Sequence, residues 1–175
     1  MASETGIGVA VKRKEDARFI TGSGRYTDDI HQFGQTYAVF ARSPHARARI
    51  ASIDTSSAMA VEGVVAAFSG ADLAADGIGD LPCGWMIHSK DGSEMVAPAH
   101  PPIATEVVNY VGEPYALVIG ETLQAARDGA EALAVEFDEL TPVVALADAA
   151  AGEQIHANVP GNRSYDWELG DEEAT

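Results

Sequence analysis

Four side chains in one ten-residue stretch have the chemistry most suited to binding. Arg42, Arg47 and Arg49 surround His45 in the segment ARSPHARARI, residues 41–50. Guanidinium groups this close in sequence can hold a phosphate or a carboxylate through paired hydrogen bonds. Alternatively, arginines that alternate along a strand lie on its polar side and pair with the chain's own carboxylates. The segment is therefore predicted to contact a partner or another domain, and not to be catalytic.

A strand-turn-helix pattern around Gly120 is the second candidate, because phosphate-binding turns have this order. An apolar run, residues 115–119, is followed by Gly120, Glu121 and Thr122 and then by an amphipathic segment. A phosphate-binding turn needs several glycines, whereas this turn has one, and Glu121 places a carboxylate where the phosphate would lie. The pattern therefore predicts a structural turn and no cofactor site.

The one cysteine and the histidines could in principle support catalysis or metal binding. Cys83 could act as a nucleophile with His88 or His100 as its base, but the spacing selects neither histidine. The histidines show no ligand spacing, and the carboxylates of Asp28, Asp29 and the segment GDEEAT lack the alternation of a calcium loop. No catalytic, cofactor-binding or metal-binding residue is assigned. A cysteine-dependent enzyme remains a separate hypothesis, testable by selective alkylation of Cys83. The five histidines are His31, His45, His88, His100 and His156.

Composition and charge limit the classes of function. The chain has 175 residues, of which 46% are hydrophobic and 22% charged, as in soluble globular proteins. A formal net charge of −16 disfavours binding to nucleic acid and to anionic membranes. No apolar run reaches the roughly 18–20 residues of a membrane span, and no signal peptide is visible. The single cysteine fits a reducing compartment, so a cytoplasmic location is predicted.

Periodicity predicts an α+β fold, a mixed β-sheet with a few short helices. The connections between several predicted strands are too short to hold a crossover helix, which argues against a regular doubly wound domain. The clearest helix is residues 122–133, with Leu123, Ala126, Ala130 and Leu133 on one face. Residues 77–102 have little periodicity and are expected to form a functional loop or to wrap around a partner. The predicted strands are residues 36–42, 47–53, 64–68, 107–110, 115–119 and 135–138.

Four motifs together resemble the start of the large subunit of molybdenum hydroxylases, the xanthine dehydrogenase and aldehyde oxidase family. The likeness is greatest to the carbon monoxide dehydrogenase large subunit type. One departure is Glu113 with Tyr115, where the family more often reads Gly-Gln-Pro-Val, and it bears on subfamily and substrate more than on membership. The motifs are RKEDARFITGSGRYTDDI, ARSPHARARIASIDTSSAM, EGVVAAFSGADL and YVGEPYALVIGETLQAARDGAEALAVEFDELTPVV, at residues 13–30, 41–59, 62–73 and 110–144.

The resemblance implies an α/β-hammerhead domain at residues 15–151, preceded by an N-terminal arm, residues 1–14. Residues 152–175 would be a linker leading to a molybdopterin-binding region that this chain does not contain. In the family the molybdenum cofactor lies in those further domains, and FAD and [2Fe–2S] clusters lie in partner subunits. The implied role is architectural, and the chain alone is expected to be inactive and to self-associate through apolar surface that is normally covered. The alternative is a stand-alone binding module that uses Arg42, Arg47 and Arg49 or the 77–102 loop.

Overall fold

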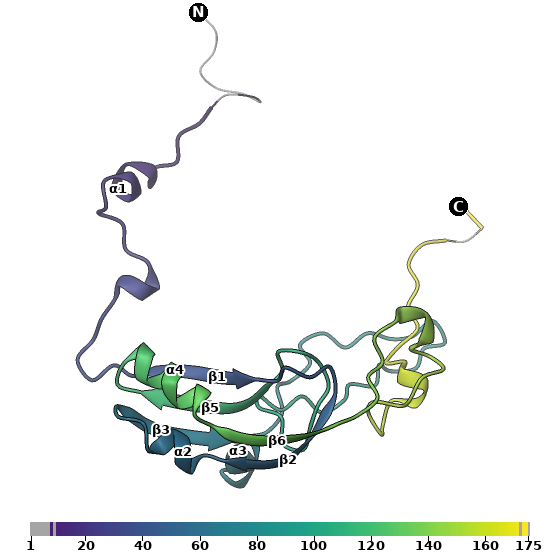
Figure 1. Cartoon of the computed structure of the whole chain (residues 1–175). Helices are drawn as coiled ribbons and strands as arrows, with labels where there is room; N and C mark the ends of the chain where they lie inside the picture. Colours follow the sequence, from purple (N-terminus) through teal and green to yellow (C-terminus); the bar gives the residue numbers. More distant parts are fainter. Residues whose placement is uncertain (1–7, 9, 172, 175) are drawn as a thin grey trace, which may run out of the picture. The chain divides into compact units, whose positions relative to one another are not determined.

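The computed structural model describes residues 8, 10–171 and 173–174, and the chain divides into two units, Met1–Gln35 and Thr36–Thr175 (Figure 1). The first unit contains the helix α1 (Asp16–Ile20) and the 3-10 turn η1 (Thr27–Asp29). Its main contact is a stack of the Phe19 and Tyr26 rings, with centroids 5.0 Å apart. Of the arm predicted at residues 1–14, positions 1–7 and 9 lie outside the described residues.

The second unit is built on two three-stranded sheets, and every pairing between their strands is antiparallel. Sheet A has the order β1-β5-β3, and sheet B has the order β4-β2-β6. With short helices between the strands, this arrangement confirms the predicted α+β class. The strands are β1 (Tyr37–Arg42), β2 (Ala48–Asp54), β3 (Val64–Ser69), β4 (Val107–Val108), β5 (Pro114–Gly120) and β6 (Ala134–Glu139).

Helix α4 (Leu123–Glu131) packs on one face of sheet A, against β1 and β5 (Figure 1). It begins where predicted, because the Thr122 hydroxyl accepts a hydrogen bond from the Ala125 amide at 3.0 Å. Its buried residues are Ala125, Ala126 and Gly129. The prediction for Leu123 is wrong, since this side chain is 40% exposed. The small residues Ala125, Ala126 and Gly129 face the sheet, and Leu123, at the start of the helix, lies outside this buried set.

The smaller helices α2 (Ser56–Met59) and α3 (Gly70–Ala75) flank β3. Helix α3 begins with a capping box, in which the Ser69 hydroxyl accepts a bond from the Asp72 amide and the Asp72 carboxylate accepts one from the Ser69 amide. The Ser69 hydroxyl also donates to the Asp72 carboxylate at 2.7 Å, and this bond, together with the bond from the Ser69 amide, holds the pKa of Asp72 below its usual range. Gly70 lies against the backbone of Ala104, since an added Cβ would lie 2.3 Å from the Ala104 carbonyl oxygen.

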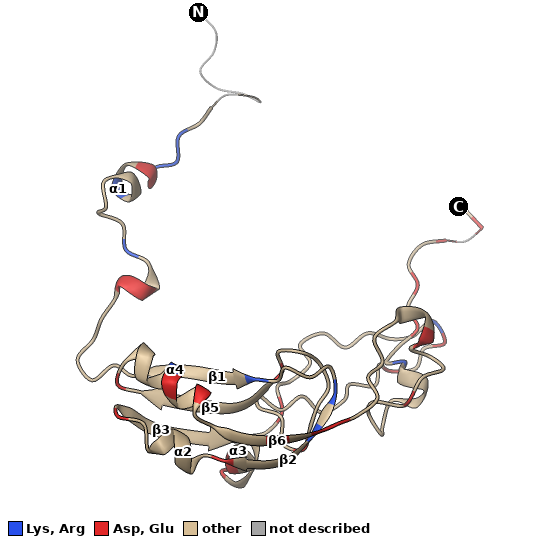
Figure 2. Ribbon diagram, in the orientation of Figure 1, with Lys and Arg blue, Asp and Glu red and all other residues tan. Residues whose placement is uncertain are grey.

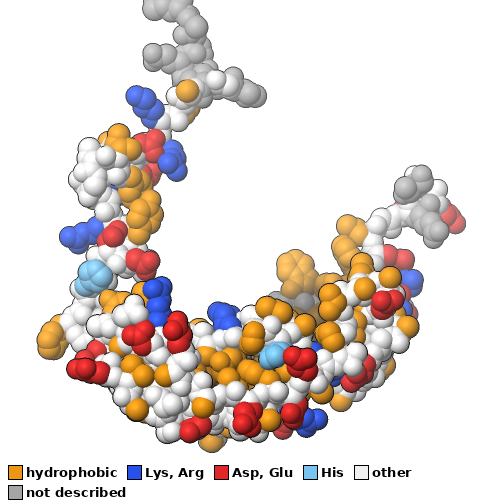
Figure 3. Space-filling view, in the orientation of Figure 1, with side chains coloured by type: hydrophobic (Ala, Val, Ile, Leu, Met, Phe, Trp, Pro, Cys, Tyr) orange, Lys and Arg blue, Asp and Glu red, His pale blue; other side chains and the backbone are white. Residues whose placement is uncertain are grey.

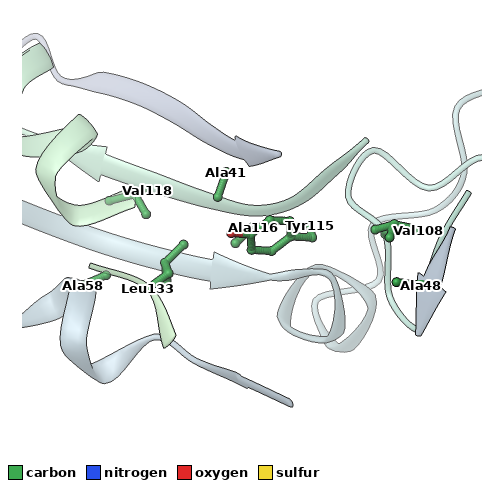
Figure 4. Close-up of a cluster of buried hydrophobic side chains, with 9 residues drawn as sticks. Ala41, Ala48, Ala58, Val108, Tyr115, Ala116, Val118 and Leu133 are labelled. Atoms are coloured by element: carbon green, nitrogen blue, oxygen red, sulfur yellow. The ribbon is translucent and has the colours of Figure 1, made fainter. Parts of the chain in front are cut away.

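The core lies between α4, sheet A and the inner face of sheet B and is rich in alanine (Figure 4). A bulge places Tyr115 in this core, because Ala41 pairs with Ala116 while Arg42 pairs with Pro114, which leaves Tyr115 as the extra residue. The Tyr115 ring meets Phe137 of β6 edge-on, with centroids 5.3 Å apart. Burial raises the pKa of the Tyr115 phenol above its ordinary value.

The irregular region between α3 and β4 is hydrogen-bonded to the C-terminal segment. A bridge pairs His88 with Glu94, and the resulting hairpin contacts residues 164–166. The Val96 amide donates to the Ser164 carbonyl at 2.9 Å, and the Lys90 amide donates to the Asp166 carbonyl at 2.7 Å. The C-terminal segment contains the short 3-10 turns η2 (Leu146–Asp148) and η3 (Pro160–Asn162). Part of the predicted linker therefore contacts the body of this unit.

Candidate functional site

Arg42 is the last residue of β1, and its side chain contacts neighbouring groups of the same chain. Its guanidinium donates to the Gly112 carbonyl at 2.9 Å and lies 5.7 Å from the centre of the Phe40 ring. The side chain is exposed, so charge remains available to a partner. Lys and Arg residues of the second unit, drawn blue in Figure 2, are scattered: they lie at the end of β1, near β2 and in the loops by the C-terminal segment, among other places.

Arg47 is nearly buried, with 9% of its side chain exposed. Its Nη1 donates to the Thr141 carbonyl at 3.1 Å and forms an ion pair with Glu153 at 3.0 Å. Its Nε is buried and has no hydrogen-bond partner within the described residues. Arg47 therefore attaches the segment after β6 to sheet B, as expected for an arginine that pairs with the chain's own carboxylates.

His45 and Arg49 have different surroundings again. The His45 ring lies 5.0 Å from the Phe137 ring, and its Nδ1 is 3.3 Å from a Glu139 carboxylate oxygen. Arg49 is exposed on β2, in register with Val107 and Asp138, and forms no ion pair with a described residue. The four residues predicted to act together therefore lie in separate environments, and the structure brings no two of their charged groups into contact within the described part of the chain.

A groove of about 850 Å³ lies beside the buried end of Arg47. Its walls come from the 77–102 region, from residues 105–110 around β4 and from residues 155–157. The apolar part of the lining includes Leu81, Met95 and Val107. The prolines Pro82, Pro98 and Pro101 also line the groove. Its acidic groups are Asp80, Glu106 and Glu113.

Arg47 and Asn109, which both line this groove, each have a buried polar atom with no hydrogen-bond partner among the described residues. In sheet B Ala48 pairs with Val108 and Arg49 with Val107, so continuing the antiparallel register by one residue places Arg47 opposite Asn109. Side chains opposite each other share one face of the sheet, and Ala48 and Val108, on the other face, belong to the core. The unpaired atoms are a donor, Nε of Arg47, and an acceptor, Oδ1 of Asn109.

The turn after β4 explains the departure at Glu113. Its carboxylate accepts a hydrogen bond from the Asn109 backbone amide, and both residues line the groove. The Ser43 amide donates to the Glu113 carbonyl at 2.9 Å, so the same residue links this turn to the end of β1. The sequence provided no signal for Asn109, because its importance arises from a strand register and not from local spacing.

The remaining sequence candidates are Cys83, the histidines and the acidic residues. Cys83 is exposed, and its thiol lies 3.4 Å from the Trp85 carbonyl, which is its one hydrogen-bond contact among described residues. It shares the groove with His100 and His156, but the structure gives it no bond to either. Across residues 8, 10–171 and 173–174, no three His, Cys, Asp or Glu side chains are grouped closely enough to hold a metal ion, while Glu172 of the acidic tail lies outside that range. None of the described helices is long and apolar enough to cross a membrane.

Sheet A has an apolar face that helix α4 does not cover, here called the open face. Two rows of cross-strand neighbours form it, since Phe40 pairs with Leu117 and Leu117 with Phe68, while Ala38 and Ala66 flank Ile119. None of these six side chains is buried, and Phe40 is 42% exposed.

Helix α4 lies on the opposite side of sheet A, because Gly129 faces Val118, the strand neighbour of Leu117 and Ile119. Sheet B differs, since its outer face includes Ser52 bonded to Glu136. Hydrophobic side chains also form a band over the strands on the side seen in Figure 3, with acidic side chains along its lower rim.

The family model described as aldehyde oxidase and xanthine dehydrogenase, a/b hammerhead domain, matches residues 21–141. The large subunit of nicotine 6-hydroxylase from Paenarthrobacter nicotinovorans is 38% identical over 79% of this chain, which is 16% of that protein. The carbon monoxide dehydrogenase large chain of Afipia carboxidovorans is 32% identical over 97% of this chain and 21% of that protein.

Among solved structures, quinoline 2-oxidoreductase from Pseudomonas putida 86 superimposes with a TM-score of 0.73 at 35% identity. The similarity covers 82% of this chain and 18% of that one. The chain thus spans about a fifth of the length of the relatives it matches.

Proposed function

Because the chain belongs to the a/b hammerhead family of aldehyde oxidases and xanthine dehydrogenases, we propose that it serves as an architectural domain of a molybdenum-dependent oxidoreductase large subunit. Its task is to pack against the cofactor-binding part of that subunit, into which residues 152–175 lead. The complete enzyme would be cytoplasmic and would assemble with FAD-binding and iron–sulfur subunits. The domain alone would be inactive.

The open face of sheet A is the observation that carries this proposal. A three-stranded sheet with apolar side chains on both faces needs a cover on both, because exposed apolar surface of this kind favours association. Helix α4 covers one face, and the six side chains of the other remain accessible. Sheets that are buried on both sides within larger proteins have strands of similar composition. The cover is proposed to be the remaining part of the subunit, since relatives continue for about four times the length of this chain.

The groove beside Arg47 does not fit a phosphorylated cofactor such as molybdopterin. It contains the carboxylates of Asp80, Glu106 and Glu113, and its arginine is already paired with Glu153. A phosphate placed there would meet repulsion without a free cation. We therefore propose that the cofactor binds in the rest of the subunit.

Hydroxyl-radical footprinting tests the cover directly. The 175-residue chain and the complete subunit, expressed from the natural reading frame, are labelled under identical conditions and digested. Labelling of Phe40 and Phe68 is expected to fall several-fold in the complete subunit. Leu123, on the α4 side, is the internal control, because its exposed fraction of 40% is close to the 42% of Phe40. Equal labelling of Phe40 in the two proteins would contradict the proposal.

A pair of matched variants adds a functional measurement. Phe40→Asp places a charge on the open face and is expected to reduce the yield of assembled subunit, because an unpaired carboxylate would be buried at the contact. Leu123→Asp changes a side chain of similar exposure and is expected to leave assembly intact. The alternative role, a stand-alone module that uses Arg42, Arg47 and Arg49, predicts the reverse: Phe40→Asp would be harmless and the isolated chain would be monomeric.

A further inference from the structure

We propose that the tip of the 77–102 region, residues 82–86, anchors this unit to the part of the large subunit that follows it. The anchor is Trp85, whose indole would insert into an apolar pocket that offers one hydrogen-bond acceptor. The inference rests on the proposed function for the source of that pocket. The tip is separate from the open face, because Trp85 belongs to the region after α3 and the open face belongs to sheet A.

The tip exposes apolar side chains that the described part of the chain does not cover. Every residue from Ala74 to Met86 is exposed, and Trp85 is 80% exposed. Single apolar residues scattered over a surface are normal, whereas several grouped in one loop mark a contact site. Tryptophan and methionine are also enriched at protein–protein interfaces. The large apolar residues of this loop are Ile78, Leu81, Trp85 and Met86.

Hydrogen bonds on both sides of the tip hold it in place. Before the tip, the Leu81 amide donates to the His100 carbonyl at 2.8 Å. After it, the Met95 amide donates to the Ile87 carbonyl at 2.9 Å. A loop that is already ordered loses less conformational entropy when its side chains are bound. Trp85 is therefore presented in the manner expected of an anchor residue.

The indole determines which kind of pocket fits. Leu81 and Cys83 line the groove beside Arg47, whereas Trp85 and Met86 do not. In the described part of the chain the Trp85 side chain forms no hydrogen bond and no ring contact, since its one bond is accepted by its backbone carbonyl from the Cys83 thiol. A buried indole N–H usually finds a hydrogen-bond partner. The matching pocket therefore has apolar walls and an acceptor such as a backbone carbonyl.

The path of the chain indicates which protein supplies the pocket. Residues 164–166 are bonded to the hairpin that follows the tip. The Val96 amide donates to the Ser164 carbonyl at 2.9 Å, and the Asp166 amide donates to the Ser89 hydroxyl oxygen at 3.3 Å. The polypeptide beyond Asp166 therefore leaves this unit from the loop region that carries Trp85. Domains that follow in the same subunit would lie nearest to the tip, so we assign the pocket to them.

Hydroxyl-radical footprinting tests whether the tip is covered. Oxidation of Trp85 is expected to fall several-fold in the complete subunit relative to the 175-residue chain, while oxidation of Leu123 changes little. A photoreactive p-benzoylphenylalanine incorporated at position 85 of the assembled enzyme then identifies the covering segment. The expected crosslink joins position 85 to a peptide of the same polypeptide beyond residue 175. A crosslink to another subunit or to a second copy would overturn the assignment.

The variant Trp85→Ser separates anchoring from the stability of this unit. In the 175-residue chain it is expected to leave the urea midpoint unchanged, because the exposed indole packs on little of that chain. In the complete subunit it is expected to speed proteolytic cleavage within residues 77–102 by about tenfold or more, the effect typical of losing an anchor tryptophan. Trp85→Phe keeps an apolar ring and lacks the indole N–H, so it is expected to retain most of the protection.

Two further results would overturn the proposal: equal oxidation of Trp85 in the two proteins, or unchanged cleavage of the Trp85→Ser subunit. A loss of stability in the isolated Trp85→Ser chain equal to that in the subunit would also do so, because the indole would then act within this unit. Footprinting of Phe40 reports separately on sheet A. Protection of Phe40 without protection of Trp85 would leave the architectural role standing and remove the anchor, whereas protection of neither would remove both.

Discussion

Replacing Gly129 by alanine tests whether close contact between α4 and sheet A, and not helix propensity, determines the residue at this position. Gly129 lies inside α4, and a Cβ added there would lie 2.7 Å from Cγ2 of Val64 and 2.9 Å from Cγ1 of Val118. Both distances are shorter than real carbon–carbon contacts, so a neighbour must move. Val118 is fully buried in the central strand of sheet A, whereas Val64 is half-buried in an outer strand. The strain would therefore fall mainly on Val64.

Two opposing effects determine how much Gly129→Ala changes the free energy of unfolding. Alanine in place of glycine inside a helix stabilises by about 1 kcal/mol through propensity alone. Adding a methyl group to a well-packed core costs about 1–3 kcal/mol. Two short contacts, one of them to a fully buried side chain, favour the upper half of that range. We therefore expect Gly129→Ala to lower the free energy of unfolding by about 1–2 kcal/mol.

Urea denaturation of the chain, followed by far-ultraviolet circular dichroism, measures the change as a shift of the midpoint at constant slope. Gly79→Ala is the control, because no atom lies within 4 Å of the added Cβ and the backbone there is not left-handed. That control is expected to be neutral or slightly stabilising. Stabilisation of about 1 kcal/mol by Gly129→Ala itself, the propensity value, would refute the packing argument.

A double-mutant cycle with Val64→Ala identifies the contact. If the methyl group added at position 129 strains Val64, shortening Val64 relieves the strain, and the double variant should be more stable than the sum of the two single changes predicts. The expected coupling is about 0.5–2 kcal/mol, as for residues in direct contact. Strict additivity would place the strain on another neighbour, and the description of Val64 as the side chain that moves would be wrong.

Three further predictions concern named contacts of this unit. Ser69→Ala removes the cap of α3 and should cost about 1 kcal/mol in urea unfolding, whereas Thr55→Ala, at the N-cap of α2, where the side chain forms no cap bond, should cost much less. The raised pKa of Tyr115 contributes stability that is present below pH 10 and lost as the pH rises through the folded-state pKa, so Tyr115→Phe should flatten the loss of thermal stability at alkaline pH. Glu153→Gln leaves the buried Arg47 without its carboxylate and should lower the free energy of unfolding by about 1–2 kcal/mol. This loss should become smaller as salt is added, because salt screens the ion pair in the unchanged chain. An unchanged urea midpoint would show that the hydrogen bond to Thr141 is enough to stabilise Arg47.

Much of the fold was predictable because local patterns and the final structure agree. Each of the six predicted strands corresponds to an observed strand within a few residues at either end, and the predicted helix after Thr122 is capped by that residue. The face of α4 was predicted less well. Hydrophobicity favours Leu123 as a core residue, but the close approach permitted by Gly129 is a tertiary effect that no single helix shows.

The candidate site was predictable only in part, because the sequence identifies charged side chains but not their partners. The segment ARSPHARARI shows that Arg42 and Arg47 are close in the chain. It does not show that one contacts the 112 carbonyl and the other Thr141 and Glu153. Asn109 is a stronger case, because its significance depends on the β2–β4 register and on Glu113 binding its backbone amide. Long-range pairing of this kind leaves no local spacing signal.

The two kinds of apolar pattern in the sequence carry information about the cover of sheet A. Strands of sheet B alternate, as in RARIASI and AVEFDE, and their structure has one inner and one outer face, with Ile50 and Phe137 packed against the core. Strands of sheet A are continuous apolar runs, VVAAFS and PYALVIG, which is typical of strands buried on both faces. Helix α4 covers only one of those faces, so the continuous runs support the proposed second layer over the open face. The proposed docking face on sheet A therefore predicts that charge placed on sheet B at Ser52 will be tolerated, whereas charge at Phe40 will not.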